Sequence, residues 1–235
     1  MHIYDEQIAY HYSAYRPHLH ELIVAEALEG RSFRNGLDVG CGTGYSSLAL
    51  TNHCERVTGI DQSQSMLDLA TEHPRVNYLL GSGEKLPIED CSVDLVTFAG
   101  VFFYLNAEAA LSELKRVCRE NALVLPYDFE VLIEDLMLLF DLPINGGDDD
   151  YDHTSNPSGM AGVATLKQVS RAIDFQVSAE EAAHILLSDK SRHEPLSGMF
   201  GTSNPFGHVV ERLAETGWDG RMWARIHYSI HQLEK

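Results

Sequence analysis

The stretch Leu37-Asp38-Val39-Gly40-Cys41-Gly42-Thr43-Gly44 decides how this chain folds. The residues over 36–39 predict a short buried strand, and the residues over 45–51 predict a helix directly after the glycines. Glycine adopts a positive φ without steric cost, and it lets the backbone pass close to a ligand. The stretch therefore predicts a strand, a tight turn and a helix, with a ligand held against the turn.

A carboxylate follows at the next strand end. The residues over 56–60 predict a second strand, and Asp61 stands at its end, about 20 residues beyond the glycine turn, which is the offset expected for a carboxylate that grips ribose hydroxyls. A glycine turn alone also occurs as a purely structural feature. Together with Asp61 it favours a nucleoside-containing cofactor at the carboxyl edge of a parallel sheet.

The spacing of the glycines argues against a nicotinamide dinucleotide. The dinucleotide fingerprint GxGxxG would need glycine at position 45, where this chain has Tyr45. A bulky residue there would crowd the helix start that the pyrophosphate approaches. A dehydrogenase is therefore the less favoured interpretation.

Strand and helix patterns alternate through the first half of the chain. Further strands are predicted over 76–80, 93–98 and 122–127, and further helices over 17–30, 63–72 and 107–119. Such alternation predicts a parallel sheet with right-handed crossovers. Beyond 127 the pattern predicts a helix (130–140), a long mobile loop (141–165), a strand (171–177), a helix opened by the capping box 178–181, a helix (205–215) capped by Asn204, and a terminal strand (221–231).

The run Gly81-Ser82-Gly83-Glu84-Lys85-Leu86-Pro87-Ile88-Glu89-Asp90-Cys91-Ser92-Val93-Asp94-Leu95-Val96 resembles the G-D-A-E-x-L-P-F-x-D-x-S-F-D-L-V signature of class I methyltransferases that use S-adenosyl-L-methionine (SAM). The likeness is to the type 11 group, which includes trans-aconitate and quinone-ring methyltransferases. Segments 15–17 and 116–119 also resemble that group. The resemblance is specific over about 12–127.

The resemblance implies a fold and a division of the chain. The fold is α/β and Rossmann-like, with a mostly parallel seven-stranded sheet flanked by helices and a lid-like insertion after the fifth strand. We expect one methyltransferase domain over 1–235: an N-terminal lid segment (1–17), a SAM-binding core (18–127), a mobile insertion (128–170) and the C-terminal part of the sheet (171–235).

The resemblance also implies the cofactor contacts. The glycines would underlie the methionine part and ribose of SAM, Asp61 the ribose hydroxyls, and Ser82 to Glu84 the adenine edge. The residues expected at the cofactor are Tyr12, Tyr15, Arg16, Asp38, Gly40, Cys41, Gly42, Thr43, Gly44, Asp61, Gln62, Met66, Ser82, Gly83, Glu84, Phe98, Ala99 and Phe103.

Two positions depart from the family pattern. Ser82 replaces the usual aspartate that accepts hydrogen bonds from the adenine amino group, and a hydroxyl accepts more weakly than a carboxylate. The usual Pro-Gly-Gly turn before the fifth strand is replaced by Glu120-Asn121-Ala122. Asn121 tolerates the left-handed conformation, so we expect the turn to survive.

The reacting centre is less defined by the sequence. Aromatic faces attract the sulfonium of SAM, so Phe103 or Tyr104 is expected to line the pocket, with Phe102 in the core. The general base stays unassigned, with His11 and Tyr104 as candidates, and a lone histidine is more often structural. No metal site is expected, because the Asp148-Asp149-Asp150 run is typical of a solvated loop.

Composition narrows the partners. With 17 basic and 35 acidic residues the net charge is −18, which opposes binding to nucleic acid or to an anionic membrane. The four cysteines form no CxxC pair, and we expect reduced thiols in a cytoplasmic protein, monomeric or weakly dimeric. The functions left open are methyl transfer from SAM to a small molecule and SAM binding without catalysis, as in a sensor or a degenerate homologue.

Overall fold

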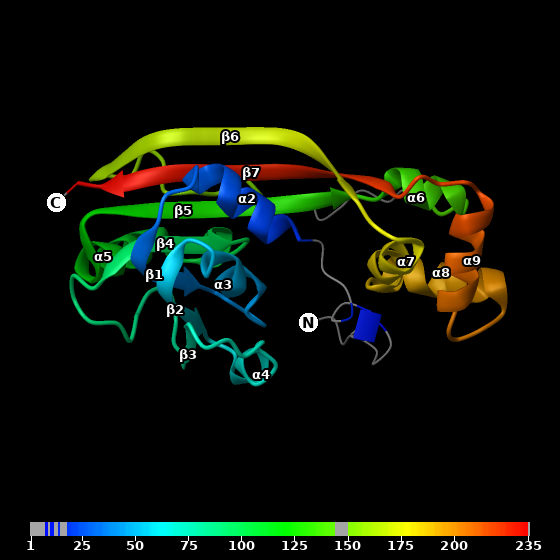
Figure 1. Ribbon diagram of the computed structural model, residues 1–235, viewed down its shortest axis with the longest axis horizontal. Coiled ribbons are helices and arrows are strands. Elements are labelled where there is room, and N and C mark those ends of the chain that lie inside the picture. Colours follow the sequence, from blue (N-terminus) through cyan, green and yellow to red (C-terminus); the bar gives the residue numbers. More distant parts are fainter. Residues whose placement is uncertain (1–7, 9, 12–13, 15–17, 144–149, 235) are drawn as a thin grey trace. The chain divides into compact units, whose positions relative to one another are not determined.

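The computed structural model describes residues 8, 10–11, 14, 18–143 and 150–234, and its described strands form one seven-stranded sheet in the order β3-β2-β1-β4-β5-β7-β6 (Figure 1). The pairs β1–β2, β1–β4, β2–β3 and β4–β5 are parallel, and β7 runs opposite to β5. The predicted mostly parallel α/β sheet is thereby confirmed. The strands are β1 (Phe33–Val39), β2 (Cys54–Asp61), β3 (Val76–Leu80), β4 (Val93–Ala99), β5 (Cys118–Leu132), β6 (Val163–Gln176) and β7 (Arg221–Leu233).

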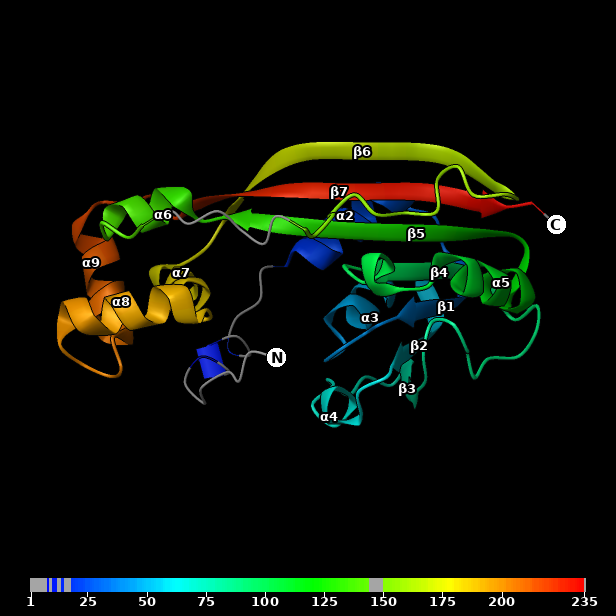
Figure 2. The same ribbon diagram turned by 180° about the vertical axis from the view of Figure 1, so that it is seen from behind.

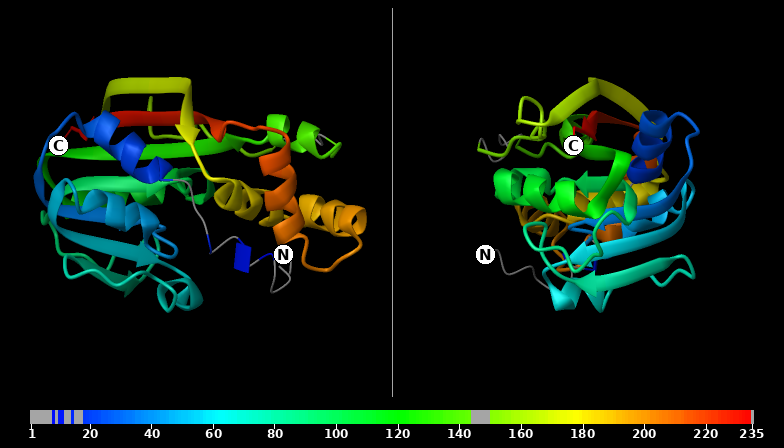
Figure 3. Two further views of the ribbon diagram at one scale, coloured as in Figure 1. Left: turned by 45° about the vertical axis from the view of Figure 1, so that its right-hand side comes forward. Right: turned by 90° about the vertical axis from the view of Figure 1, so that its left-hand side faces the viewer.

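Helices fill the connections between these strands. They are α2 (Leu19–Leu28), α3 (Tyr45–Leu50), α4 (Gln64–Leu67), α5 (Ala107–Val117), α6 (Glu134–Leu139), α7 (Ala179–Leu187), α8 (Lys190–Phe200), α9 (Phe206–Glu215) and the 3₁₀ turn η1 (Phe102–Tyr104). Within the first half of the chain, α5 covers one face of the sheet, and α2 and α3 cover the opposite face (Figure 3). Both faces of the parallel strands are thus shielded from water.

The chain divides into two compact units, each with its own core. The core unit comprises the described residues of 18–129, 150–171 and 226–235, and the helical unit those of 1–17, 130–149 and 172–225. In the core unit, Leu37, Val96 and Leu114 are buried between the sheet and α5. In the helical unit, α7, α8 and α9 pack together (Figure 2) around a cluster that includes Leu186 and Leu213. Burying each such side chain stabilises the fold by about 1.5–3 kcal/mol.

Two predicted helices are shorter in the structure. The helix expected over 63–72 ends at Leu67, because the backbone turns away and the Thr71 N–H donates to the Thr43 carbonyl at 3.2 Å. The helix expected over 130–140 begins at Glu134, since β5 continues to Leu132 beside β7, where Glu130 pairs with Arg225 at 2.8 Å.

The second half holds further differences. Helix α8 was not predicted, and it contains Pro195 and a glycine at 198, which both disfavour a helix. The segment expected as a mobile loop over 141–165 contains hydrogen-bonded turns at 152–158, and β6 already begins at Val163. Asn204 accepts from the Phe206 N–H at 3.3 Å at the start of α9, and Asn121 has the expected left-handed φ of 66°. Among the described helices, none has the length and apolar character that crossing a membrane requires.

Candidate functional site

The glycine turn after β1 combines tight packing with one open position. Gly40, Gly42 and Gly44 have φ of 72°, 53° and 90°. A Cβ at Gly40 would lie 2.5 Å from the Val101 side chain, and one at Gly44 would lie 2.1 Å from the Tyr78 hydroxyl. A Cβ at Gly42 would meet nothing within 4 Å. Packing therefore requires two of the glycines, and the third faces space that a ligand can occupy.

Asp61 fastens this turn to the end of β2. Its Oδ2 accepts from the Gly42 N–H at 2.8 Å, and its Oδ1 accepts from the Ser63 N–H at 2.9 Å. Each carboxylate oxygen has a second lone pair, so both can accept another hydrogen bond from a ligand. The carboxylate thus positions the turn and still offers two acceptor sites.

The turn and Asp61 border a cavity of about 220 Å³ in the core unit. This volume lies below the ~300–1,000 Å³ of typical ligand pockets, which suits one end of a larger ligand. The cavity lies at the carboxyl ends of the parallel strands, where open α/β sheets bind ligands. Its lining residues are Val39, Gly40, Asp61, Gln62, Gly81, Ser82, Gly83, Glu84, Val101, Tyr104 and Leu105.

Asp38 lies beneath the turn and supports it from inside. Its carboxylate is fully buried and accepts from the hydroxyls of Ser46 at 2.6 Å, Ser47 at 2.7 Å and Thr97 at 2.9 Å. Burial raises the pKa of Asp38, and the three hydrogen bonds oppose that rise. Asp38 therefore joins β1 to α3 and β4, and it is absent from the cavity lining.

Residues 37–125 match a family model described as a methyltransferase domain. Over 91 residues the chain is 38% identical to a malonyl-[acyl-carrier protein] O-methyltransferase of Serratia marcescens, covering 38% of this chain and 36% of that protein. Over 118 residues it is 28% identical to a candidate methyltransferase of Dictyostelium discoideum, covering 50% and 44%. The matched regions thus span less than half the length of these curated relatives.

Among solved structures, a candidate type II methyltransferase of Anaeromyxobacter dehalogenans has the same fold. It superposes with a TM-score of 0.66 at 20% identity, covering 94% of this chain and all of the other. Residues 37–125 form a methyltransferase domain, and the chain has the fold of a solved methyltransferase. The sequence prediction of this family is confirmed, and SAM is the cofactor that the family uses.

The geometry fits the nucleoside end of SAM. Asp61, Gln62 and Ser82 offer polar atoms to the cavity, and the open space at Gly42 lies beside the Asp61 carboxylate. Ribose hydroxyls are donors that a carboxylate binds well. When bound, SAM supplies an electrophilic methyl group on its sulfonium sulfur.

The expected adenine edge has limited spare hydrogen-bonding capacity. Ser82 lines the cavity and forms a short antiparallel bridge with Lys85. Gly83 is buried against Leu105 and Val39, where a Cβ would lie 3.1 Å from both side chains. Glu84 Oε1 accepts from the Asn106 N–H at 3.1 Å. The Ser82 hydroxyl and the remaining acceptor sites of Glu84 thus stay available to the adenine.

The aromatic residues after β4 divide between core and surface. Phe98 is 1% exposed and packs edge-to-face on Phe102, their ring centroids 5.4 Å apart, so Phe102 lies in the core as predicted. Ala99 is half-buried at the end of β4, and Phe103 is 41% exposed. Phe103 is therefore accessible to a ligand, whereas Phe98 supports the site from within.

Three further expected cofactor residues occupy different surroundings. Met66 is 44% exposed on α4. Thr43 is half-buried in the turn, where its carbonyl accepts from the Thr71 N–H. Cys41 is buried, and burial raises the pKa of its thiol far above the usual range, so it is not a nucleophile.

The candidates for the general base belong to different units. Tyr104 lines the cavity and is 71% exposed. His11 belongs to the helical unit, where it is buried and stacks on Phe206 with Nδ1 2.9 Å from His184 Nδ1. The expected contacts of Tyr12, Tyr15 and Arg16 lie outside the described residues. In the part of the chain described, no cluster of His, Cys, Asp and Glu is arranged to hold a metal ion.

Val101 and Leu105 line the cavity but were not expected there. They flank the turn η1. An apolar residue in a short loop can line a pocket or pack in the core, and the sequence alone does not distinguish the two. The glycine at position 40 does carry a sequence signal, because a glycine in such a turn implies that a neighbour packs closely against it. The structure shows that this neighbour is Val101.

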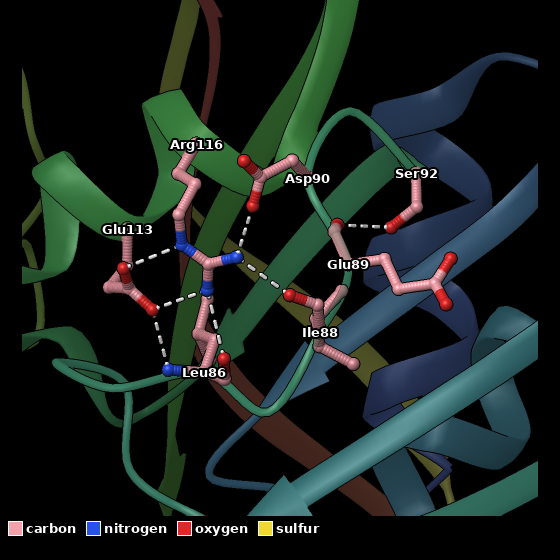
Figure 4. Close-up of polar contacts among 7 residues, drawn as sticks. All are labelled: Leu86, Ile88, Glu89, Asp90, Ser92, Glu113 and Arg116. Atoms are coloured by element: carbon pink, nitrogen blue, oxygen red, sulfur yellow. Dashed lines mark hydrogen bonds and ion pairs between the residues drawn. The ribbon is translucent and has the colours of Figure 1, made fainter.

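A guanidinium holds the loop that follows the cavity edge (Figure 4). Arg116 on α5 donates to Glu113, to Asp90 and to the carbonyl oxygens of Leu86 and Ile88 at 2.7–2.9 Å. Glu113 also accepts from the Leu86 N–H at 2.7 Å. The pair fixes the segment directly after Glu84 and thereby the position of the cavity edge.

Proposed function

We propose that the protein transfers the methyl group of SAM to a small molecule. The observation that carries the proposal is the cavity beside the glycine turn that Asp61 and Ser82 line at the carboxyl ends of the parallel strands. Methyl transfer is an in-line displacement, so a scaffold that fixes the cofactor relative to an acceptor supplies much of the rate. The net charge of −18 favours a small acceptor over nucleic acid.

The cofactor is tested by thermal unfolding. SAM or S-adenosylhomocysteine (SAH) is expected to raise the melting temperature, because a ligand stabilises the state it binds, while NAD and NADP leave it unchanged. A rise with NAD alone would contradict the proposal.

A second candidate function is SAM binding without turnover. Ser82, the weaker acceptor at the adenine edge, favours it, and so does the absence of histidine and lysine among the described residues that line this cavity. Mass spectrometry distinguishes the two candidates by the SAH formed from SAM with and without a cell metabolite extract. Extract-dependent SAH supports the transferase, and SAM binding without any SAH supports the sensor.

A further inference from the structure

A second cavity of about 360 Å³ lies in the core unit, between β5, β6, β7 and the segment after residue 152. Its polar lining includes His153, Thr154, Asn156, Gln168, His227 and Ser229. None of the described lining residues is Asp, Glu, Lys or Arg. A charged molecule would lose its hydration there without a counterion, whereas a neutral molecule with hydroxyl groups would find hydrogen-bond partners.

A histidine in this lining is oriented by a carboxylate. His153 Nδ1 lies 2.9 Å from Asp128 Oδ2, and the Asp128 side chain is 16% exposed. An ionised carboxylate only accepts, so Nδ1 carries the proton and donates it to Asp128. The lone pair of the neutral imidazole is then on Nε2, which is the arrangement of a general base with a positioning acid.

The Asp128 carboxylate also lies close to the end of β4, one of the strands whose carboxyl ends border the cofactor site. Asp128 directly follows Tyr127, which pairs with Ala99 at the end of β4. The Tyr151 hydroxyl donates to Asp128 Oδ2 at 2.8 Å and lies 3.0 Å from the Gly100 carbonyl oxygen. His153 and Asp128 thus stand beside the carboxyl end of β4, next to Ala99, which is one of the residues expected at the cofactor.

Neither Tyr151 nor Asp152, the neighbouring acidic groups, competes with His153 for the hydroxyl proton of an acceptor. Burial, and then the Asp128 carboxylate, raise the pKa of Tyr151 well above its usual range, so Tyr151 stays protonated. Asp152 accepts from Thr154 and stays ionised, since those hydrogen bonds lower its pKa. His227 stacks on His153 with ring centroids 6.3 Å apart. Asp128, Tyr151, Asp152 and His227 are the groups that face the imidazole from β5, the 150s segment and β7.

We propose that this cavity binds the methyl acceptor, a neutral molecule that carries a hydroxyl, and that His153 is the catalytic base, positioned by Asp128. The inference rests on the proposed methyl transfer. The acceptor oxygen forms a bond to the methyl carbon while the carbon–sulfur bond breaks, and that electron pair stays on sulfur to give SAH. The hydroxyl proton passes to His153 Nε2.

Binding is tested by NMR with histidine labelled at ¹³Cε1 and SAH at saturation. Phenol, catechol and hydroquinone serve as neutral probes, and benzoate is the anion of similar size. The His153 signal is assigned with His153→Gln. The neutral probes are expected to shift the His153 and His227 signals, and benzoate is expected to shift neither. Unchanged His153 signals with all three neutral probes, or a larger shift with benzoate, would overturn the acceptor site.

Catalysis is tested with the same three phenols and SAM. His153→Gln should lower kcat by about 10²-fold or more, leave the Kd of SAH within twofold, and remove the fall in rate at acid pH that protonation of the base causes. Asp128→Asn should lower kcat. Its rate should still fall at acid pH, at a shifted pH, because this variant changes the group that orients His153 and not the base itself. His208→Gln, an exposed histidine outside the site, is the matched control.

The outcomes separate the two proposals. Rates of wild type and His153→Gln within twofold, whether high or undetectable, would overturn the base assignment. Failure of SAH to bind would overturn the proposed function, and the NMR shifts without SAH would still decide whether neutral phenols occupy the cavity.

Discussion

At the scale of a single residue, Asp61 holds the glycine turn and borders the cavity proposed for the cofactor. Its two oxygens accept from the backbone at Gly42 and Ser63 and border the cavity. Asp61→Ala is expected to weaken SAH binding by about 2–3 kcal/mol, because charge-assisted hydrogen bonds to the ribose would be lost. Calorimetric titration measures this. Asp61→Asn keeps one acceptor oxygen and should lose less, and unchanged affinity in a folded Asp61→Ala variant would exclude Asp61 as the ribose ligand.

Ser82 gives a prediction of the opposite sign. Ser82→Asp places a carboxylate at the adenine edge, and a carboxylate accepts more strongly from an amino group than a hydroxyl does. We expect a several-fold lower Kd for SAH. Ser65→Asp is the matched control, since it adds the same charge at an exposed position on α4. Equal or weaker binding in Ser82→Asp would show that residue 82 does not accept from the adenine.

At the scale of an element, the end of α5 holds the loop that leads out of the cavity. Arg116→Ala should lower the free energy of unfolding by about 2 kcal/mol, because the loop carbonyls and Glu113 would lose their donors. Arg116→Lys should recover part of this loss, since an ammonium lacks the planar fork. Urea unfolding measures both variants. Arg56→Ala, at an exposed position of β2, is the control, and an equal loss there would contradict the clamp.

Element patterns predicted the sheet better than the helices. The end of β1 over 36–39 and the middle of β4 over 95–98 are buried on both faces, as expected of inner strands of a parallel sheet. The extent of α4 depends on a hydrogen bond between Thr71 and Thr43, which no local pattern encodes. Helix α8 forms despite Pro195, because its buried residue Leu196 packs in the cluster of the helical unit.

The candidate site also contains residues that sequence offsets predict and residues that only the fold brings together. The glycine turn and Asp61 could be predicted because fixed offsets along the chain determine their meeting. Asp38 lies in the glycine motif and was expected at the cofactor, yet its carboxylate accepts hydrogen bonds from three hydroxyls inside the protein. Asp128, one residue beyond the predicted fifth strand, had the same strand-end signal as Asp61. Its partner His153 comes from a segment predicted as a mobile loop. The sequence alone therefore could not predict that His153 and Asp128 meet.

At the scale of the whole molecule, two buried histidines make stability depend on pH. Burial, together with His184 and His193, lowers the pKa of His11 from 6.5 to about 4, and burial alone lowers the pKa of His231 to about 4. Both are neutral in the folded protein when the unfolded chain already binds their protons. The free energy of unfolding is therefore expected to fall as pH drops from about 6.5 towards 4.

The loss should be on the order of 1–2 kcal/mol for each histidine between pH 7 and pH 5. General electrostatics predicts the opposite sign, because the net charge of −18 shrinks on acidification and self-repulsion weakens. Guanidinium unfolding at pH 7, 6 and 5, followed by circular dichroism, decides between the two. A double variant, His11→Gln and His231→Gln, keeps hydrogen-bonding groups that do not titrate and should show a shallower pH dependence. Exposed His208→Gln should retain the wild-type slope, and a double variant as acid-sensitive as wild type would assign the loss to other groups.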